Sequence, residues 1–263
     1  MNNYEKLEGM VAATFTPLDE NGDVNLSVID KYADWIASTP IKGVFVCGTT
    51  GEFSSLTIDE RKLILEKWLV SARKRFKVIA HVGSNCQRSA MELARHAAQV
   101  GADAIASIAP SFFKPGTVDE LVDFFAPICH SAAGLPFYYY NMPSITGVNL
   151  PVDKFLVEGK KKIPNLVGTK FTHNNLMEMG VCIELEQHRF EVLHGYDEIL
   201  ISGLAMGAVA GVGSTYNYIP NVYQAIFDSM KMNDLETARH NQIKSIRTVE
   251  VIIKYGGGVR GGK

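Results

Sequence analysis

The feature that most constrains this chain is a regular alternation of short apolar runs with amphipathic stretches along its whole length. Each run has the length of a strand and is rich in β-branched or aromatic residues. Continuous apolar runs are typical of parallel strands that are covered on both faces. The eight runs are MVAATFT (10–16), KGVFVC (42–47), KVIAHV (77–82), DAIASIA (103–109), PFYYYN (136–141), LVGTKF (166–171), FEVLH (190–194) and AVAGVG (208–213).

The stretches between the runs carry the signals of helix starts. Three of them fit the capping box, in which a threonine or serine is followed three residues later by a glutamate. These are Thr57-x-x-Glu60, Ser89-x-x-Glu92 and Thr117-x-x-Glu120. One stretch also places Leu65, Trp68, Leu69 and Ala72 on one helical face.

Eight strands that each precede a helix predict an α/β fold, the (β/α)8 TIM barrel, with the whole chain 1–263 as one domain. An open doubly wound sheet is the alternative, although no GxGxxG fingerprint supports it. A helix is expected over 216–231, and the amphipathic stretch 233–255 adds a C-terminal helix beyond the eight units. Because the chain stops in the glycine-rich segment 256–263, we expect this extension to be incomplete from about 233, as in a fragment.

Composition excludes several classes of protein. A net charge of -2 provides no strong field for nucleic acid, and no run of 18 apolar residues provides a membrane span. The segment MNNYEKLEG (1–9) lacks the apolar core of a signal peptide, so we expect a cytoplasmic location. The four scattered cysteines and the seven histidines show no metal-ligand spacing, and we expect no metal.

Polar residues follow the second and fifth predicted strands, at the barrel end where catalytic residues lie. The second strand runs into GTTGE (48–52), in which the hydroxyls of Thr49 and Thr50 and the free backbone N–H groups suit a small carboxylate. An ordinary strand-to-helix turn is the alternative. In the fifth strand Tyr138 and Tyr140 share one face. Tyr140 is placed to relay protons, although a tyrosine of the core would look the same.

Lys170 lies in the sixth predicted strand. Lysine is among the residues least often buried, so this one either reaches solvent at the strand end or is held inside for a reason. Removal from water favours the neutral amine, which is a nucleophile toward a carbonyl.

The seventh and eighth predicted strands lead into HGYDE (194–198) and GVGSTYN (211–217). Asp197, Glu198 and Ser214 are therefore candidates for binding sugar hydroxyls. For the two acids, a place at a helix N-terminus is the alternative.

The motifs GTTGE, YYYNMPSITG, GTKFTHNN, HGYDE and GVGSTYN, in this order, resemble the dihydrodipicolinate synthase/N-acetylneuraminate lyase family from Val11 to about Gly258. The synthases of this family usually carry an arginine two residues after the proline of the Y-N-x-P motif, where it meets a second substrate carboxylate. Ile145 stands at that position here, which resembles the lyase branch.

The resemblance implies an aldolase that cleaves N-acetylneuraminate reversibly to N-acetylmannosamine and pyruvate, as a homotetramer with no metal or organic cofactor. It implies that Lys170 forms an imine with the substrate and that Tyr140 relays protons. Thr49 and Thr50 would bind the pyruvate carboxylate, and the sugar tail would be held by Thr172, Gly195, Asp197, Glu198 and Ser214.

One departure from the family concerns the segment after the fourth strand, APSFFKP (109–115). Many members place a tyrosine there that completes the proton relay, and Phe112 occupies its place. The sequence also leaves other functions open. These are another pyruvate-dependent aldolase of the family, acting on a 2-keto-3-deoxy sugar acid or making dihydrodipicolinate, and a non-catalytic sugar-acid sensor.

Overall fold

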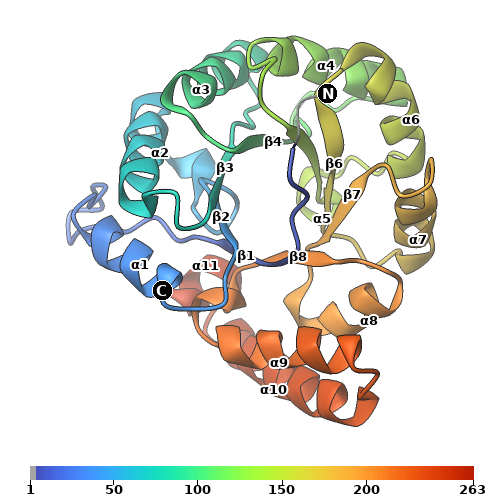
Figure 1. The fold of residues 1–263 in the computed structure, drawn as a ribbon. Helices are drawn as coiled ribbons and strands as arrows, with labels where there is room; N and C mark the ends of the chain where they lie inside the picture. The colour runs from blue at the N-terminus through green and yellow to red at the C-terminus, as the bar shows by residue number, and fades with distance from the viewer. Residues whose placement is uncertain (1–3) are drawn as a thin grey trace.

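Eight parallel strands close into a single barrel in the computed structural model, which describes residues 4–263 (Figure 1). Each strand pairs with the next in the chain, and β8 pairs with β1. The predicted (β/α)8 barrel is confirmed, and the open doubly wound sheet is wrong. The strands are β1 (Gly9–Ala13), β2 (Gly43–Val46), β3 (Lys77–His81), β4 (Ala104–Ile108), β5 (Phe137–Asn141), β6 (Leu166–Phe171), β7 (Glu191–His194) and β8 (Ala210–Gly213).

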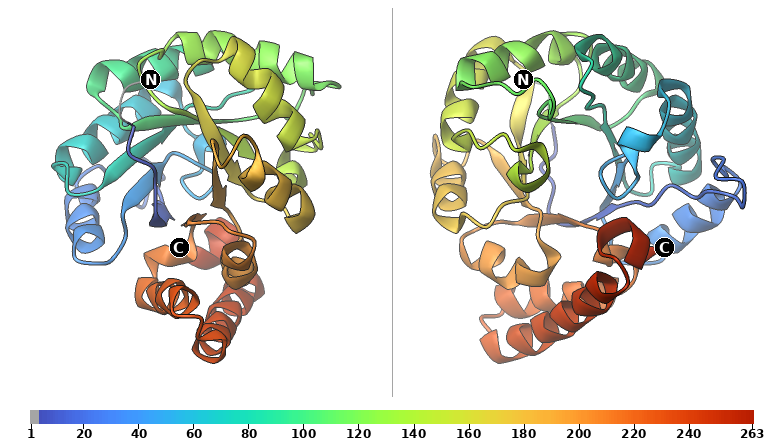
Figure 2. Two further views of the ribbon diagram at one scale, coloured as in Figure 1. Left: turned by 45° about the vertical axis from the view of Figure 1, so that its right-hand side comes forward. Right: turned by 180° about the vertical axis from the view of Figure 1, so that it is seen from behind.

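Helices surround the barrel (Figures 1 and 2). The α-helices are α1 (Val28–Ala37), α2 (Ile58–Ala72), α3 (Gln87–Val100), α4 (Val118–His130), α5 (Pro143–Thr146), α6 (Val152–Lys162), α7 (Leu176–Glu184), α8 (Leu200–Ala205), α9 (Pro220–Lys231), α10 (Leu235–Lys254) and α11 (Gly258–Gly262). Short 3₁₀ turns are η1 (Phe53–Ser55), η2 (Asp197–Ile199) and η3 (Thr215–Asn217). Within residues 4–263, no helix is both long and apolar enough to cross a membrane. Residues 1–3 of the segment that we compared with a signal peptide lie outside the described part of the chain.

The C-terminal helices confirm the expected helical stretch at 233–255, which becomes α10. The helix expected from residue 216 begins later, at Pro220, because η3 occupies Thr215–Asn217. Figure 2 shows α9 and α10 side by side near β8 and β1, and α10 also contacts η2 and η3. Helix α10 therefore lies against the two turns that follow β7 and β8.

The predicted capping boxes have three different outcomes. At α2 the box is complete: the Thr57 hydroxyl accepts the Glu60 N–H at 3.2 Å, and the Glu60 carboxylate accepts the Thr57 N–H at 2.7 Å. At α4 only half forms, because Thr117 accepts the Glu120 N–H while the Glu120 carboxylate accepts the N–H of Gly116.

The third box, at Ser89, is wrong. Helix α3 begins earlier, at Gln87, with Cys86 at its N-cap, so Ser89 already lies in the first turn. The hydroxyl of Ser84 accepts the Cys86 N–H at 3.1 Å and holds the turn that precedes the helix.

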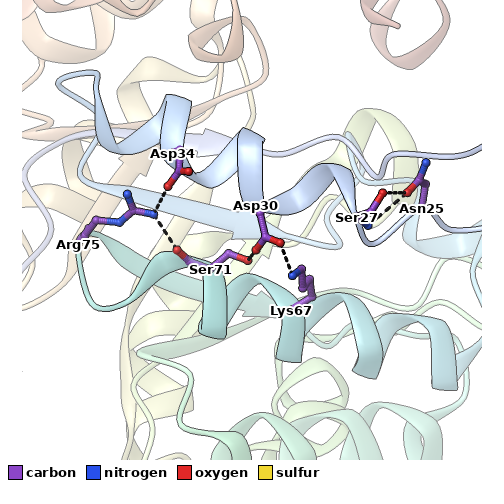
Figure 3. Close-up of polar contacts among 7 residues, drawn as sticks. All are labelled: Asn25, Ser27, Asp30, Asp34, Lys67, Ser71 and Arg75. Carbon is purple, nitrogen blue, oxygen red and sulfur yellow. Dashed lines mark hydrogen bonds and ion pairs between the residues drawn. The ribbon is translucent and has the colours of Figure 1, made fainter.

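Helices α1 and α2 pack side by side and are joined by polar contacts along their edges (Figure 3). Asp30 accepts hydrogen bonds from Lys67 and Ser71, each at 2.6 Å. Asp34 accepts one from Arg75 at 2.8 Å. The predicted apolar face of α2 turns inward, where Leu65, Trp68 and Ala72 are buried and Leu69 is half-buried.

Two separate cores fill the inside of the barrel and the space between strands and helices. The alternation predicted for the three tyrosines of β5 is confirmed, because Tyr138 and Tyr140 belong to the interior core and Tyr139 to the outer one. The Tyr139 ring packs on Phe155 of α6 with 4.6 Å between ring centroids.

A bulge in β6 decides which way its lysine faces. Phe137 pairs with Leu166, but Tyr138 pairs with Gly168, so Val167 is an extra residue. Leu166 packs in the outer core, and simple alternation would turn Lys170 outward with it. The extra residue shifts the register by one and places Lys170 opposite Tyr140, on the interior side.

Candidate active site

Lys170 and Tyr140 form the centre of the site, at the carboxyl ends of β6 and β5. The lysine is 4% exposed, and its Nζ lies 4.0 Å from the centroid of the Tyr140 ring and 4.4 Å from that of Phe45. None of the ion pairs within residues 4–263 involves this amine. The bulge therefore presents a buried amine that no carboxylate neutralises.

The Tyr140 hydroxyl connects this centre to the GTTGE turn. It lies 3.2 Å from the Thr49 hydroxyl, and it donates to the Met142 sulfur at 3.0 Å. A phenol beside an amine, with a second hydroxyl in reach, is an arrangement that can pass protons. The structure thus brings together Lys170, Tyr140 and Thr49.

The GTTGE turn follows a path that its glycines and two unusual backbone angles permit. Cys47 and Glu52 stand at its two ends in the left-handed region, with φ of 55° and 56°. A Cβ on Gly48 would lie 2.7 Å from the Phe45 ring, and one on Gly51 would lie 3.1 Å from the Cys47 Cα. Between them Thr49 and Thr50 are half-buried, and the Thr49 hydroxyl lies in reach of the Tyr140 hydroxyl.

His81 lies beside Tyr140, and no pattern in the sequence singles it out. Its ring centroid is 5.9 Å from that of Tyr140, and its Nδ1 is 2.8 Å from the Cys47 carbonyl oxygen. Burial, followed by the charge of Arg61, holds the pKa of His81 well below its usual value. A neutral ring beside a carbonyl must carry its proton on Nδ1, so His81 donates to Cys47 and anchors the start of the turn.

Thr172 and Gly195 meet at the ends of β6 and β7. The Gly195 N–H donates to the Phe171 carbonyl at 2.9 Å, and a Cβ on Gly195 would overlap the Thr172 hydroxyl. That hydroxyl is buried and has no hydrogen-bond partner within residues 4–263. Glycine at position 195 therefore keeps space open above a free hydroxyl.

Asp197 is buried, and one of its oxygens is fully engaged. Oδ2 accepts from the Thr215 backbone N–H at 2.9 Å and from the Thr215 hydroxyl at 2.6 Å. Burial raises the pKa of Asp197 to about 6, against the hydrogen bonds from Thr215 and the charge of Lys170, which lower it. Oδ1 has no partner within the described residues. Asp197 and Glu198 both stand in the first turn of η2, as the alternative expected, but the Asp197 carboxylate bonds to the turn after β8.

The remaining residues singled out in the sequence are Glu198, Ser214, Ile145 and Phe112. Glu198 and Ser214 are half-buried on the same two turns as Asp197 and Thr215. Ile145, in α5, is 60% exposed. Phe112 is 76% exposed in the loop between β4 and α4, where its ring contacts Phe113 with 5.0 Å between centroids.

Sequence reasoning missed four residues of this site. Phe45 could have been found, because alternation in β2 places it on the interior side. Thr215 follows a predicted residue directly, but nothing in the sequence connects it to Asp197. Met142 and His81 carry no sequence signal that separates them from ordinary packing residues.

The site combines a buried lysine at the end of β6, a tyrosine beside it on β5 and a threonine turn after β2. Comparison with known proteins shows the family to which a barrel with this site belongs. The model of the dihydrodipicolinate synthetase family matches residues 6–257, and the chain belongs to this family. The chain is accordingly a carbon–carbon lyase.

Within the family the similarity to N-acetylneuraminate lyases is high. The chain is 42% identical to the N-acetylneuraminate lyase of Mus musculus, over 97% of this chain and 81% of that one. It is 43% identical to that of Gallus gallus, over 98% of this chain and 85% of that one.

Solved structures give the same result. The N-acetylneuraminate lyase of Proteus mirabilis superposes with a TM-score of 0.96 at 36% identity, covering 98% of this chain and 87% of that one. A dihydrodipicolinate synthase from Aquifex aeolicus superposes with a TM-score of 0.87 at 27% identity, covering 94% and 83%. The barrel is thus common to both branches, and sequence identity is higher to these lyases.

Proposed function

We propose that this protein is an N-acetylneuraminate lyase that cleaves N-acetylneuraminate reversibly to N-acetylmannosamine and pyruvate through an imine on Lys170. The observation that carries the proposal is the buried, unpaired amine of Lys170, 4.0 Å from the Tyr140 ring centroid, with the Tyr140 hydroxyl in reach of Thr49. The similarity to lyases from several organisms supports the choice of substrate.

Imine formation begins when neutral Lys170 attacks the C2 ketone of open-chain N-acetylneuraminate. The C–N bond forms, water leaves, and protonation of the nitrogen makes the imine an electron sink. The rings of Phe45 and Tyr140 cover Nζ and limit the access of water to the reacting nitrogen.

Cleavage of the C3–C4 bond sends its electron pair into the imine and gives an enamine. The 4-hydroxyl loses its proton to the Tyr140 oxygen, while Tyr140 passes its own proton to the substrate carboxylate. N-Acetylmannosamine leaves with its aldehyde formed at the former C4. Protonation of the enamine at C3 and addition of water then release pyruvate and restore the free amine.

Two different parts of the site bind the two ends of the substrate. Thr49, Thr50 and the backbone N–H groups of their turn bind the carboxylate and so orient the imine. The hydroxyl tail of the sugar is held at the ends of β6, β7 and β8, by Thr172, Gly195, Asp197, Glu198 and Ser214. No step in this sequence requires a metal or an organic cofactor, because the imine is the electron sink.

Among the rival aldolases, position 145 counts against the one that makes a dicarboxylate product. A dicarboxylate product requires a cation there, and exposed Ile145 provides none. A sugar-acid sensor has no use for the paired Lys170 and Tyr140.

Our proposal also includes a homotetramer in the cytoplasm, and light scattering of the purified protein tests its assembly.

A pyruvate-release assay tests the proposed substrate. The protein is given N-acetylneuraminate or a 2-keto-3-deoxy sugar acid at equal concentration, with Lys170→Ala as the blank. We expect kcat/KM to be highest for N-acetylneuraminate. Faster release from the competing acid would assign the chain to another aldolase of the family.

A further inference from the structure

Helix α10 contacts Asp197, one of the residues that we propose bind the sugar half of the substrate. The Gln242 side chain donates to the Asp197 backbone carbonyl at 3.0 Å and accepts the Ile201 N–H at 2.8 Å. The Ser245 hydroxyl lies 3.2 Å from the same carbonyl. Both side chains are buried, although α10 lies outside the eight strand–helix units that form the barrel.

A second connection runs from the carboxylate of Asp197 back to the same helix. The Thr215 hydroxyl donates to Asp197 Oδ2 at 2.6 Å and also contacts the Tyr223 hydroxyl. The Tyr223 hydroxyl, on α9, lies 2.7 Å from the Ser245 hydroxyl. Asp197, Thr215, Tyr223 and Ser245 thus form a closed ring of polar contacts, which we call the Asp197 ring.

The three hydroxyls of this ring have one hydrogen each to donate. When Asp197 is ionised, Thr215 must donate to its carboxylate. The hydrogen of Ser245 goes to the Asp197 backbone carbonyl, and that of Tyr223 goes to Thr215 or to Ser245. Loss of a member therefore leaves a buried neighbour without its partner.

We propose that Gln242, Ser245 and Tyr223 are positioning residues that fix Asp197 and so set the affinity of the site for the sugar half of the substrate. This inference rests on the proposed function. The keto half is held separately, because the contacts of Lys170 are with Tyr140 and Phe45, and neither belongs to the Asp197 ring. Disturbing the ring should therefore weaken sugar binding and leave pyruvate binding unchanged.

The experiment measures both KM values in the synthetic direction, from pyruvate and N-acetylmannosamine, with the full chain. The variants are Tyr223→Phe and Ser245→Ala, which each remove one hydroxyl. The control is Ser229→Ala, which removes the hydroxyl of a buried α9 serine outside the ring. We expect each ring variant to raise KM for N-acetylmannosamine about 5- to 10-fold, the effect of one buried hydrogen bond, with KM for pyruvate changed less than about 2-fold.

Parallel rises in both KM values, or no rise for N-acetylmannosamine, would overturn the inference. If the ring variants fold poorly, Thr215→Val and Thr215→Ser provide a second test. Valine keeps the shape of threonine without the hydroxyl and serine keeps the hydroxyl, so only the valine variant should raise KM for the sugar.

Failure of the proposed function would look different. The wild type would then form an imine with pyruvate but would not condense it with N-acetylmannosamine. The same comparison of KM values is made in that case with the hydroxyaldehyde that the wild type accepts. Unequal effects on the two KM values would support the inference, and equal effects would contradict it.

Discussion

Lys170 and Tyr140 face each other across adjacent strands, with the lysine Nζ 4.0 Å from the centroid of the tyrosine ring. An ammonium group over an aromatic face is attracted by the ring electrostatically, without an ion pair. This relationship keeps the lysine oriented and leaves its nitrogen free for a carbonyl carbon. It also places Lys170, which we propose forms the imine, next to Tyr140, which we propose transfers the proton.

Tyr140→Phe separates these two roles. The phenyl ring keeps the surface that supports Lys170, so the imine with pyruvate should still form. The proton relay is lost, and we expect turnover to fall by about 10²-fold, the size of a lost acid–base group. The control is Tyr139→Phe, which removes a buried hydroxyl on the outer side of the same strand. Turnover of Tyr140→Phe close to the wild-type value would remove Tyr140 from the relay.

The decline of kcat/KM on the acid side of its pH profile, the acid limb, should follow the protonation of Asp197. Burial raises the pKa of this carboxyl to about 6, so it takes up a proton as the pH falls through that value. If its ionised form accepts the sugar hydroxyl, kcat/KM for N-acetylneuraminate should decline below about pH 6.

Thr215→Val removes the hydroxyl that donates to the ionised carboxylate. The pKa of Asp197 should then rise further, and the acid limb should move to higher pH by about one unit. The measurement is kcat/KM between pH 4.5 and 8, with Thr215→Ser as the matched control. An acid limb at the same pH in both variants would show that another group controls it.

Gly168→Ala tests the bulge that turns Lys170 inward. A Cβ at this position would overlap the Glu191 carbonyl oxygen of the neighbouring strand. Strand β6 must shift to make room, and we expect the free energy of unfolding to fall by about 3 kcal/mol, the upper range for overpacking. Activity should fall as well, because the shift moves Lys170.

Gly134→Ala is the control for this variant, since a Cβ there meets no heavy atom within 4 Å. Urea unfolding of both variants gives the two free energies. Equal stability of the two proteins would mean that the bulge tolerates a side chain.

The uncharged side chain of Ile145 indicates a pocket that binds a sugar acid and not a dicarboxylate. The wild type should cleave N-acetylneuraminate and should show no useful condensation of pyruvate with aspartate semialdehyde. Ile145→Arg supplies the cation that the dicarboxylate needs, so any condensation should appear in that variant. Condensation by the wild type that is faster than cleavage would contradict this account of specificity.

The fold was predictable because its signals repeat. Seven of the eight apolar runs contain a whole strand and the first overlaps one, and the box at Thr57 starts its helix as predicted. The box at Ser89 failed because a local turn held by Ser84 starts the helix earlier. Such turns depend on single hydrogen bonds, which short sequence motifs describe poorly.

Sequence patterns single out the candidate residues of the site but do not contain their geometry. Lys170 was singled out as a lysine in an apolar strand, but its inward direction depends on the bulge at Val167, which no pattern in the sequence marks. Asp197 was placed at the sugar end, but its partners Thr215 and Ser245 come from other elements. Contacts between elements far apart in sequence are set by tertiary packing, which local patterns do not contain.

Reductive trapping tests the central claim most directly. The protein is incubated with pyruvate and sodium borohydride, digested, and the modified peptide is identified by mass spectrometry. We predict a single adduct on Lys170, the buried amine beside Tyr140, and none in Lys170→Arg. An adduct on a different lysine, or no adduct on protein that is active, would contradict the imine mechanism.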